Sequence, residues 1–209
     1  MKNYKNLSKE EWRSALVENW LLFVNGREPD NEAFAELYSL CVDSLLSYGA
    51  SLGVNKDTSE DVVHDLFCYL YIRRRSLRNV HNIVSYLFIA FKNRAINAVK
   101  RNSRGTDLGV GFASFSTGVT VMDSLLDDEE RETIRRTVEK LLGELSSRQR
   151  EAVYLRYMLN LDYDEISHVL KMNTDSVRKL VYRALLRLRH ANTSKLPLLF
   201  FIITPFYHL

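Results

Sequence analysis

The sequence predicts an all-α protein made of two small helical domains joined by a flexible linker, with a helix-turn-helix in the second domain. Apolar residues recur every three to four positions through most of the chain, which is the period of an amphipathic helix. Alternating strand patterns are scarce, and the 209 residues include only 3 Pro and 8 Gly. A chain of this length holds one large domain or two small ones.

Four helices are expected in residues 1–104. The first ends near Gly26, a polar break at 55–59 precedes the third, and the fourth covers 84–101. Their apolar positions are, in order, Trp12, Leu16, Trp20 and Phe23; Phe34, Leu37, Tyr38, Cys41, Leu45 and Tyr48; Val62, Val63, Leu66, Phe67 and Leu70; and Tyr86, Leu87, Phe88, Phe91, Ile96 and Val99.

A linker is expected after these helices. Four of the eight glycines lie between Gly105 and Gly118, in a stretch that also collects Ser and Thr and lacks a helical period. We therefore divide the chain into a first domain at 1–104, a flexible linker at 105–130, a second domain at 131–190 and an apolar tail at 191–209.

Two helices are expected at the start of the second domain. The first has Ile134, Val138, Leu141 and Leu142 at helical spacing. The second is expected to begin at a cap formed by Ser146 or Ser147 and to run through Met158.

Residues 161–189 predict the helix-turn-helix. Asp162 precedes a short apolar run and has Glu165 three residues on, which is the spacing of a capping box. The apolar stripe of this first helix is interrupted at 171–173, and Asn173 is placed to cap a second helix. Two short helices joined by such a turn are the unit that inserts its second helix into the major groove of DNA.

The second helix of this unit carries a concentrated positive charge. Between Lys171 and His190 there are six Lys or Arg residues and one acid, Asp175, in a chain whose net charge is only +3. A lone basic helix is more often a solvated surface. The capped helix and turn that precede it favour contact with the phosphates of duplex DNA.

The first domain separates its charges by segment. Residues 57–65 hold four acids and no base, 90–104 hold five bases and no acid, and 73–79 hold four arginines suited to phosphate contact. Exposed structural salt bridges are the alternative for each segment. Five aromatic residues near the bases could stack unpaired bases, although helical spacing predicts that at least three are buried. These are Tyr69, Tyr71, Tyr86, Phe88 and Phe91.

This order of segments resembles a bacterial RNA polymerase sigma factor of the sigma-70 superfamily, in its compact extracytoplasmic-function subgroup. The resemblance covers about 20–104, with the motif DVVHDLF, and 132–190. It is strongest in the second span, at positions that the family usually fills in this way. They are Leu145, Ser146, Arg148, Gln149, Arg150, Tyr163, Glu165, Ile166, Val177, Arg183, Ala184 and Leu188.

The resemblance implies a role for each charged segment. The acidic helix would dock on the clamp helices of the largest subunit of core RNA polymerase, the basic helix would open the minus-ten element, and the recognition helix would read the minus-thirty-five element. The flap of the second-largest subunit is a further implied partner, and the resemblance allows an anti-sigma factor. The docking positions are Asp61, His64, Asp65 and Phe67; the minus-ten positions Asn79, Tyr86, Arg94, Asn97, Lys100 and Arg101; the minus-thirty-five positions Asn173, Thr174, Ser176, Arg178, Lys179, Tyr182 and Arg183.

Three residues depart from the usual family pattern. His64 stands where Gln is common, Asn97 where Asp is common, and Tyr86 in place of a Trp near the start of the melting helix. Each retains a hydrogen-bonding group, and Tyr86 retains a stacking face. His64 would give docking a mild pH dependence, against the alternative of a neutral, partly exposed imidazole.

Other functions fit less well. A helix-turn-helix regulator that binds an operator without docking on polymerase remains the alternative. The five histidines show no metal-binding spacing and no glycine-rich phosphate loop is present, so we expect no catalytic residue, no cofactor and no metal. Cys41 and Cys68 lie in apolar helical patterns and are expected to be reduced core residues.

Neither end of the chain predicts insertion into a membrane. The N-terminus lacks the apolar core and cleavage site of a signal peptide, so a cytoplasmic location is expected. The apolar run at 198–203 in the tail is far shorter than the roughly 20 residues that a spanning helix requires. The tail is expected either to cover an apolar patch or to mask the recognition helix or bind a regulator.

Overall fold

The computed structural model describes residues 7–26, 28–103, 115, 136 and 139–191. The described elements are all helical, as the sequence predicts. The chain divides into two compact units, unit 1 at 1–113 and unit 2 at 114–209. The expected tail lies outside the described residues, as does most of the expected linker.

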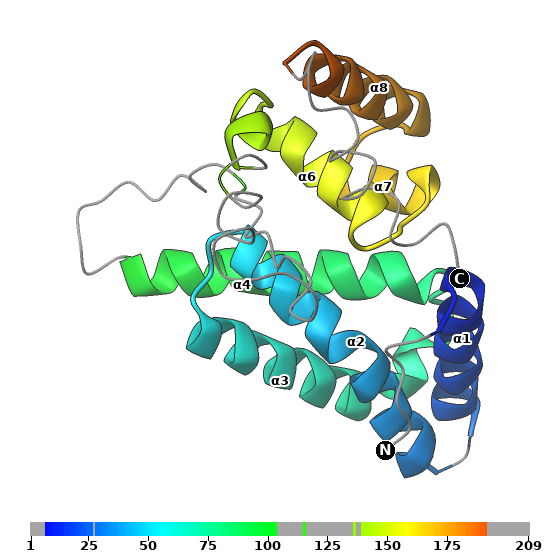
Figure 1. The fold of residues 1–209 in the computed structure, drawn as a ribbon. Helices are drawn as coiled ribbons and strands as arrows, with labels where there is room; N and C mark the ends of the chain where they lie inside the picture. The colour runs from blue at the N-terminus through cyan, green and yellow to red at the C-terminus, as the bar shows by residue number, and fades with distance from the viewer. Residues whose placement is uncertain (1–6, 27, 104–114, 116–135, 137–138, 192–209) are drawn as a thin grey trace, which may run out of the picture. The chain divides into compact units, whose positions relative to one another are not determined.

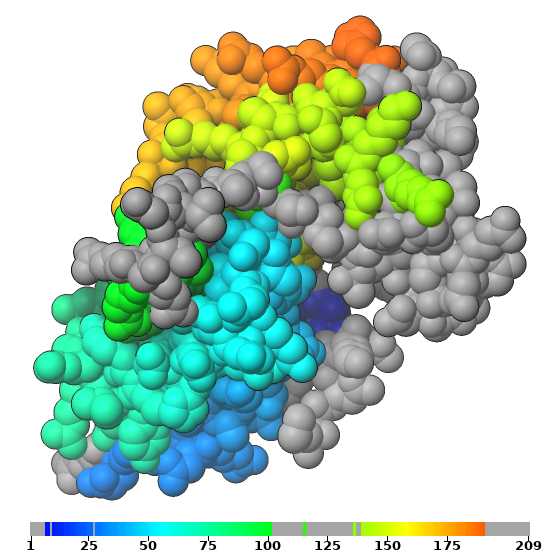
Figure 2. Space-filling view, turned by 90° about the vertical axis from the view of Figure 1, so that its left-hand side faces the viewer, coloured from blue at the N-terminus to red at the C-terminus, as the bar shows by residue number. Residues whose placement is uncertain are grey.

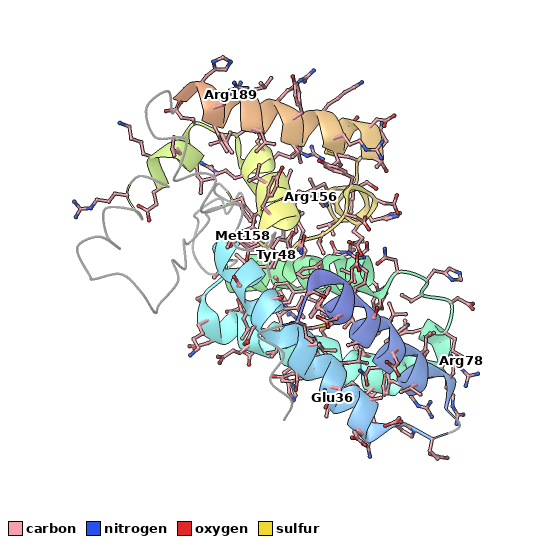
Figure 3. The ribbon with its side chains drawn as sticks, turned by 45° about the vertical axis from the view of Figure 1, so that its right-hand side comes forward. Glu36, Tyr48, Arg78, Arg156, Met158 and Arg189 are labelled. Carbon is pink, nitrogen blue, oxygen red and sulfur yellow. The ribbon has the colours of Figure 1, made fainter. Side chains whose placement is uncertain are left out.

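Unit 1 consists of α1 (Lys9–Asn25), α2 (Asn31–Ser51), α3 (Lys56–Arg73), a short 3-10 helix η2 (Arg74–Leu77) and α4 (Ile83–Ser103). Helix α2 packs between α1 and α3, and α4 packs against α3, as Figure 1 shows. The predicted apolar stripes meet in the core of this unit, where Leu16, Leu45 and Phe91 are completely buried. Tyr48, labelled in Figure 3, is also completely buried, and its ring meets the edge of Phe88 at 5.6 Å.

Polar caps fix the starts of these helices. Ser8 and Glu11 form a capping box on α1, because the Glu11 amide donates to Ser8 Oγ at 3.3 Å and the Ser8 amide donates to Glu11 Oε2 at 2.8 Å. Asp30 accepts the Ala33 amide at the start of α2, and Asn55 accepts the Thr58 amide at the start of α3. These caps satisfy amides that have no partner within the helix.

Two of the four arginines at 73–79 stabilise the fold, which corrects their interpretation as phosphate contacts. The buried Arg74 donates from Nη1 to the carbonyl of Gly26 at 2.8 Å, and Arg78 donates from Nε to the carbonyl of Val24 at 2.9 Å. Helix α1 has no basic residue in its own last turn. The two guanidinium groups supply the positive charge that a helix C-terminus favours, and Figure 3 shows Arg78 beside α1.

Unit 2 contains α6 (Ser147–Tyr157), α7 (Tyr163–Leu170) and α8 (Thr174–Ala191), which pack against one another. Residues 139–143 are also helical, and Leu141 and Leu145 join Val153, Ala184 and Leu188 in the core of the unit. Ser146, one of the two expected residues, caps α6 through a capping box with Gln149. The expected apolar positions Ile134 and Val138 lie outside the described residues.

Phe115 belongs to the core of unit 2, although the sequence placed it in the linker. Its side chain is 4% exposed, its ring meets the edge of Tyr154 at 5.3 Å, and its amide donates to Ser147 Oγ at 2.9 Å. The Gly- and Ser-rich composition of its surroundings gave no sign of this contact.

Candidate nucleic-acid interface

Contacts at both ends of α7 hold the helix-turn-helix. Asp162 and Glu165 form the predicted capping box on α7, with hydrogen bonds of 2.8 and 2.9 Å. Lys171 ends α7 in the left-handed region, at φ 51° and ψ 53°. Arg148, from α6, donates to the carbonyl of Leu170 at 3.0 Å. The start of α8 is therefore fixed relative to α6 and α7.

A stacked arrangement joins α6, α7 and α8. Two guanidinium groups contact the ring of Tyr163, with Arg156 at 4.6 Å and Arg178 at 5.7 Å from the ring centroid. Arg156 also donates to the carbonyl of Leu161 at 2.9 Å. Figure 3 labels Arg156 on α6. Such cation–π contacts orient Arg178, which is on the predicted recognition helix.

Helix α8 separates an apolar face from a cationic face. Val177, Val181, Ala184 and Leu188 are buried against the rest of the unit. The exposed positions include Arg178, Lys179, Tyr182, Arg183, Arg187 and Arg189. Tyr182 is 63% exposed, which leaves its ring free to contact a ligand.

The predicted minus-thirty-five residues fall into two groups. Lys179, Tyr182 and Arg183 project from α8 as expected. The others are partly engaged within the protein: Asn173 Oδ1 accepts the Ser176 amide at 2.7 Å and so caps α8, and Thr174 Oγ1 lies 3.4 Å from Asp164 Oδ1. Arg178 forms a 3.2 Å ion pair with Asp175.

The predicted minus-ten residues lie on α4 and on the segment before it. Asn79 precedes α4 and is exposed, as are Asn97, Lys100 and Arg101 near the C-terminal end of the helix. Tyr86 and Arg94 are half-buried, and both contact Tyr69 of α3. Tyr69 was not among the predicted site residues, because its partners are distant in the sequence.

The expectation that at least three of the five nearby aromatic residues are buried is wrong. Only Phe88 and Phe91 are buried, whereas Tyr69 and Tyr71 are each 38% exposed and Tyr86 is half-buried. A tyrosine near the edge of a helix bundle can bury its ring and keep its hydroxyl accessible. More aromatic surface is available to a ligand than spacing predicted.

The acidic segment forms an exposed face of α3. Asp61, His64 and Asp65 are exposed, and the chain around residues 50–60, drawn in cyan, reaches the surface in Figure 2. Phe67, the fourth predicted docking residue, is instead 4% exposed and packs against Phe34 and Tyr38. Its ring holds α3 in unit 1, so we remove it from the candidate contact surface.

The two cysteines differ from each other, contrary to the prediction that both are core residues. Cys41 is buried, and burial raises the pKa of its thiol well above the usual value. Cys68 is exposed on α3, with Sγ 3.7 Å from His64 Nε2. Cys68 lies four residues after the exposed His64, so it shares the exposed face of α3.

Within the described residues, no group of three or more His, Cys, Asp or Glu side chains is arranged to hold a metal ion. None of the described helices has the length and apolarity needed to cross a membrane.

Comparison with known proteins finds a family model that matches unit 2 and a relative that is similar over most of the chain. Residues 135–188 match the family model described as sigma-70, region 4. The chain is 22% identical over 154 residues to the ECF RNA polymerase sigma factor SigM of Bacillus subtilis (strain 168), a match that covers 74% of this chain and 91% of the relative. The chain is therefore similar to extracytoplasmic-function sigma factors, and its residues 135–188 match region 4 of the sigma-70 family. The relative's coverage extends well beyond the region 4 match.

Two solved structures share the fold. RpoE of Bartonella quintana, solved with the anti-sigma factor NepR, gives a TM-score of 0.57 at 21% identity and covers 78% of this chain and 99% of that chain. CnrH, solved with the cytosolic domain of CnrY, gives a TM-score of 0.55 at 17% identity and covers 88% of this chain and 97% of that chain. The matched region 4 contains α6, α7 and most of α8.

Proposed function

We propose that this protein is an extracytoplasmic-function sigma factor that binds core RNA polymerase and directs promoter-specific initiation of transcription. The observation that supports it most strongly is the similarity to a sigma factor over 74% of the chain, combined with the separation of an acidic exposed helix from two cationic helices. A protein that only binds an operator has no need of the acidic face on α3. The operator-binding alternative is therefore not favoured.

Each surface has a separate part in this proposal. Asp61, His64 and Asp65 on α3 dock on the clamp helices of the largest polymerase subunit. The cationic face of α8 reads the minus-thirty-five element in the major groove. The exposed residues of α4 and Asn79 contact the minus-ten element as it opens, together with Tyr86 and Arg94. Unit 2 also contacts the flap of the second-largest subunit.

The proposal extends to regulation, chemistry and location. Sigma factors initiate transcription without catalysis of their own, and we propose the same here, because the polymerase supplies the reaction. RpoE was solved with the anti-sigma factor NepR, and an anti-sigma factor is a fitting regulator of this chain. Action on polymerase and promoter DNA places the protein in the cytoplasm.

Reconstituted transcription tests the proposal. The protein and core polymerase are incubated with a library of chromosomal fragments, and transcript starts are mapped. We expect starts that require this protein and share two upstream elements. The operator-binding alternative predicts tight binding to duplex DNA by the protein alone and no added starts.

A charge-reversal variant tests the docking surface. Asp61→Arg combined with Asp65→Arg places like charges against the basic partner that the acidic face requires, and should weaken core binding by more than about tenfold. Asp43→Arg reverses an exposed acid on α2 and is the matched control. Equal core binding by both variants would remove α3 from the docking surface.

A further inference from the structure

A cluster of three side chains joins α3 to α4. The guanidinium carbon of Arg94 lies 4.6 Å from the centroid of the Tyr69 ring, so the charged plane covers one face of the ring. A hydrogen bond joins the side chains of Tyr86 and Tyr69. Arg94 Nη1 also lies 3.3 Å from the carbonyl of Ala90, on its own helix. Tyr69 therefore contacts both half-buried residues of the proposed minus-ten surface.

The hydroxyl of Tyr86 is held in its neutral form. Partial burial raises the pKa of Tyr86, and its neighbour Tyr69 raises it further, while Arg94 lowers it by less. The hydrogen bond to Tyr69 restrains the Tyr86 hydroxyl and so orients the Tyr86 ring.

Tyr69 also lies in line with the acidic face of α3. Asp61, Asp65 and Tyr69 follow one another at intervals of four residues, so they form one stripe along the helix, and all three are exposed. The stripe begins at the proposed docking surface and ends at the side chains that meet the promoter. One helix thus presents groups to both partners.

We propose that Tyr69 is a positioning residue for promoter opening, which holds Arg94 and Tyr86 in the orientation that engages the unpaired strand of the minus-ten element. This inference rests on the proposed sigma-factor function. An arginine stacked on a ring retains its outward N–H groups for a phosphate, and less of its freedom is lost when it binds. The oriented Tyr86 presents a ring on which an extruded base can stack.

A structural role alone would have different consequences. Tyr71 lies on the same helix, is 38% exposed like Tyr69, and packs against Phe34. Its hydroxyl donates to Asn31 Oδ1 at 3.2 Å, so its recorded contacts are to α1 and α2 rather than to α4. Tyr71→Leu is therefore the matched control for Tyr69→Leu.

The test measures promoter opening by holoenzyme, through the permanganate reactivity of unpaired thymines. We expect Tyr69→Leu to slow opening by about two- to fivefold, the effect of one exposed cation–π contact. Core binding and the closed complex should be unchanged. Tyr69→Phe keeps the stacking on Arg94 and loses only the hydrogen bond to Tyr86, so it should slow opening by less than Tyr69→Leu does. Arg94→Lys keeps the charge without the planar group, so it should slow opening similarly even if Tyr69→Leu fails to fold.

Combining the substitutions distinguishes positioning from packing. In an Arg94→Ala background, Tyr69→Leu should cause little further loss, because its effect acts chiefly through Arg94. The inference is overturned if the two losses multiply fully, if Tyr71→Leu slows opening as much, or if Arg94→Lys opens at the unmodified rate. Failure of the sigma-factor function itself would appear differently, as no open complex with the unmodified protein.

Discussion

Asp175 restrains the recognition helix, and its removal should strengthen DNA binding. It is the one acid between Lys171 and His190, and its carboxylate lies 3.2 Å from Nη1 of Arg178. The two side chains are 79% and 60% exposed, so the pair contributes only about 0.2–1 kcal/mol. Asp175→Asn frees Arg178 and removes a charge that repels phosphate.

The magnitude follows from these two effects. Loss of the restraint and of the repulsion should tighten binding to duplex DNA by about two- to fivefold at low salt. If Arg178 gains a phosphate contact, the slope of log affinity against log salt concentration should steepen by up to about 0.9. The same substitution removes an acid from the first turn of α8, which should lower helix stability by about 0.3–1 kcal/mol.

The assay is fluorescence anisotropy with a labelled duplex over a series of salt concentrations, and Asp43→Asn is the control for an exposed acid in unit 1. The expected result combines tighter binding with slightly easier unfolding of α8. Unchanged affinity and slope, or weaker binding, would show that the cationic face of α8 does not meet the phosphates.

Two further predictions concern the stability of each unit. Lys171→Gly should stabilise unit 2 by about 0.5 kcal/mol. Lys171 has φ 51°, and glycine removes the strain that a Cβ atom causes in this conformation. Part of this gain is offset because glycine raises the conformational entropy of the unfolded chain. Amide hydrogen exchange in α7 measures this, and Lys179→Gly within α8 should instead destabilise by about 1 kcal/mol. Burial raises the pKa of the Cys41 thiol, so the thiol stays neutral in the folded protein while it ionises near its ordinary pKa of 9.0 in the unfolded chain. The free energy of unfolding is therefore unaffected below that pKa and falls as pH rises above it. Between pH 7 and 10 this loss is about 1.4 kcal/mol in the free energy of unfolding of unit 1. Cys41→Ala should abolish that part of the pH dependence, whereas Cys68→Ala, at an exposed position, should leave it unchanged. The measurement is urea denaturation followed by the fluorescence of the two tryptophans, both of which lie in unit 1.

The sequence predicted most of the helices and caps, because those signals are local. The Asp162–Glu165 capping box and the cap at Asn173 each act over three residues, and the structure confirms them. Of the two residues expected to cap α6, the structure selects Ser146. The two-unit boundaries and the individual contact residues stay predictions.

The errors arose where a side chain has a distant partner. Arg74 and Arg78 bind carbonyl groups 48 and 54 positions earlier in the chain, which composition does not reveal. Tyr69 depends on Arg94, one helix further on. Phe67 and Cys68 were misassigned for a different reason. Phe67 lies four residues after Val63 on the buried stripe of α3, whereas Cys68 lies four residues after His64 on the exposed face.

The central claim is that unit 1 and unit 2 contact different promoter elements within one holoenzyme. A DNA-cleaving reagent tethered to a single cysteine tests this claim. The cysteine is introduced at one of two exposed positions, as Asp175→Cys on α8 or Asn93→Cys on α4. The background is Cys68→Ala, in which the buried Cys41 is protected from labelling. With core polymerase bound, the account predicts cuts at the minus-thirty-five element from α8 and at the minus-ten element from α4. Cuts from both positions at one short site, in the absence of polymerase, would contradict it.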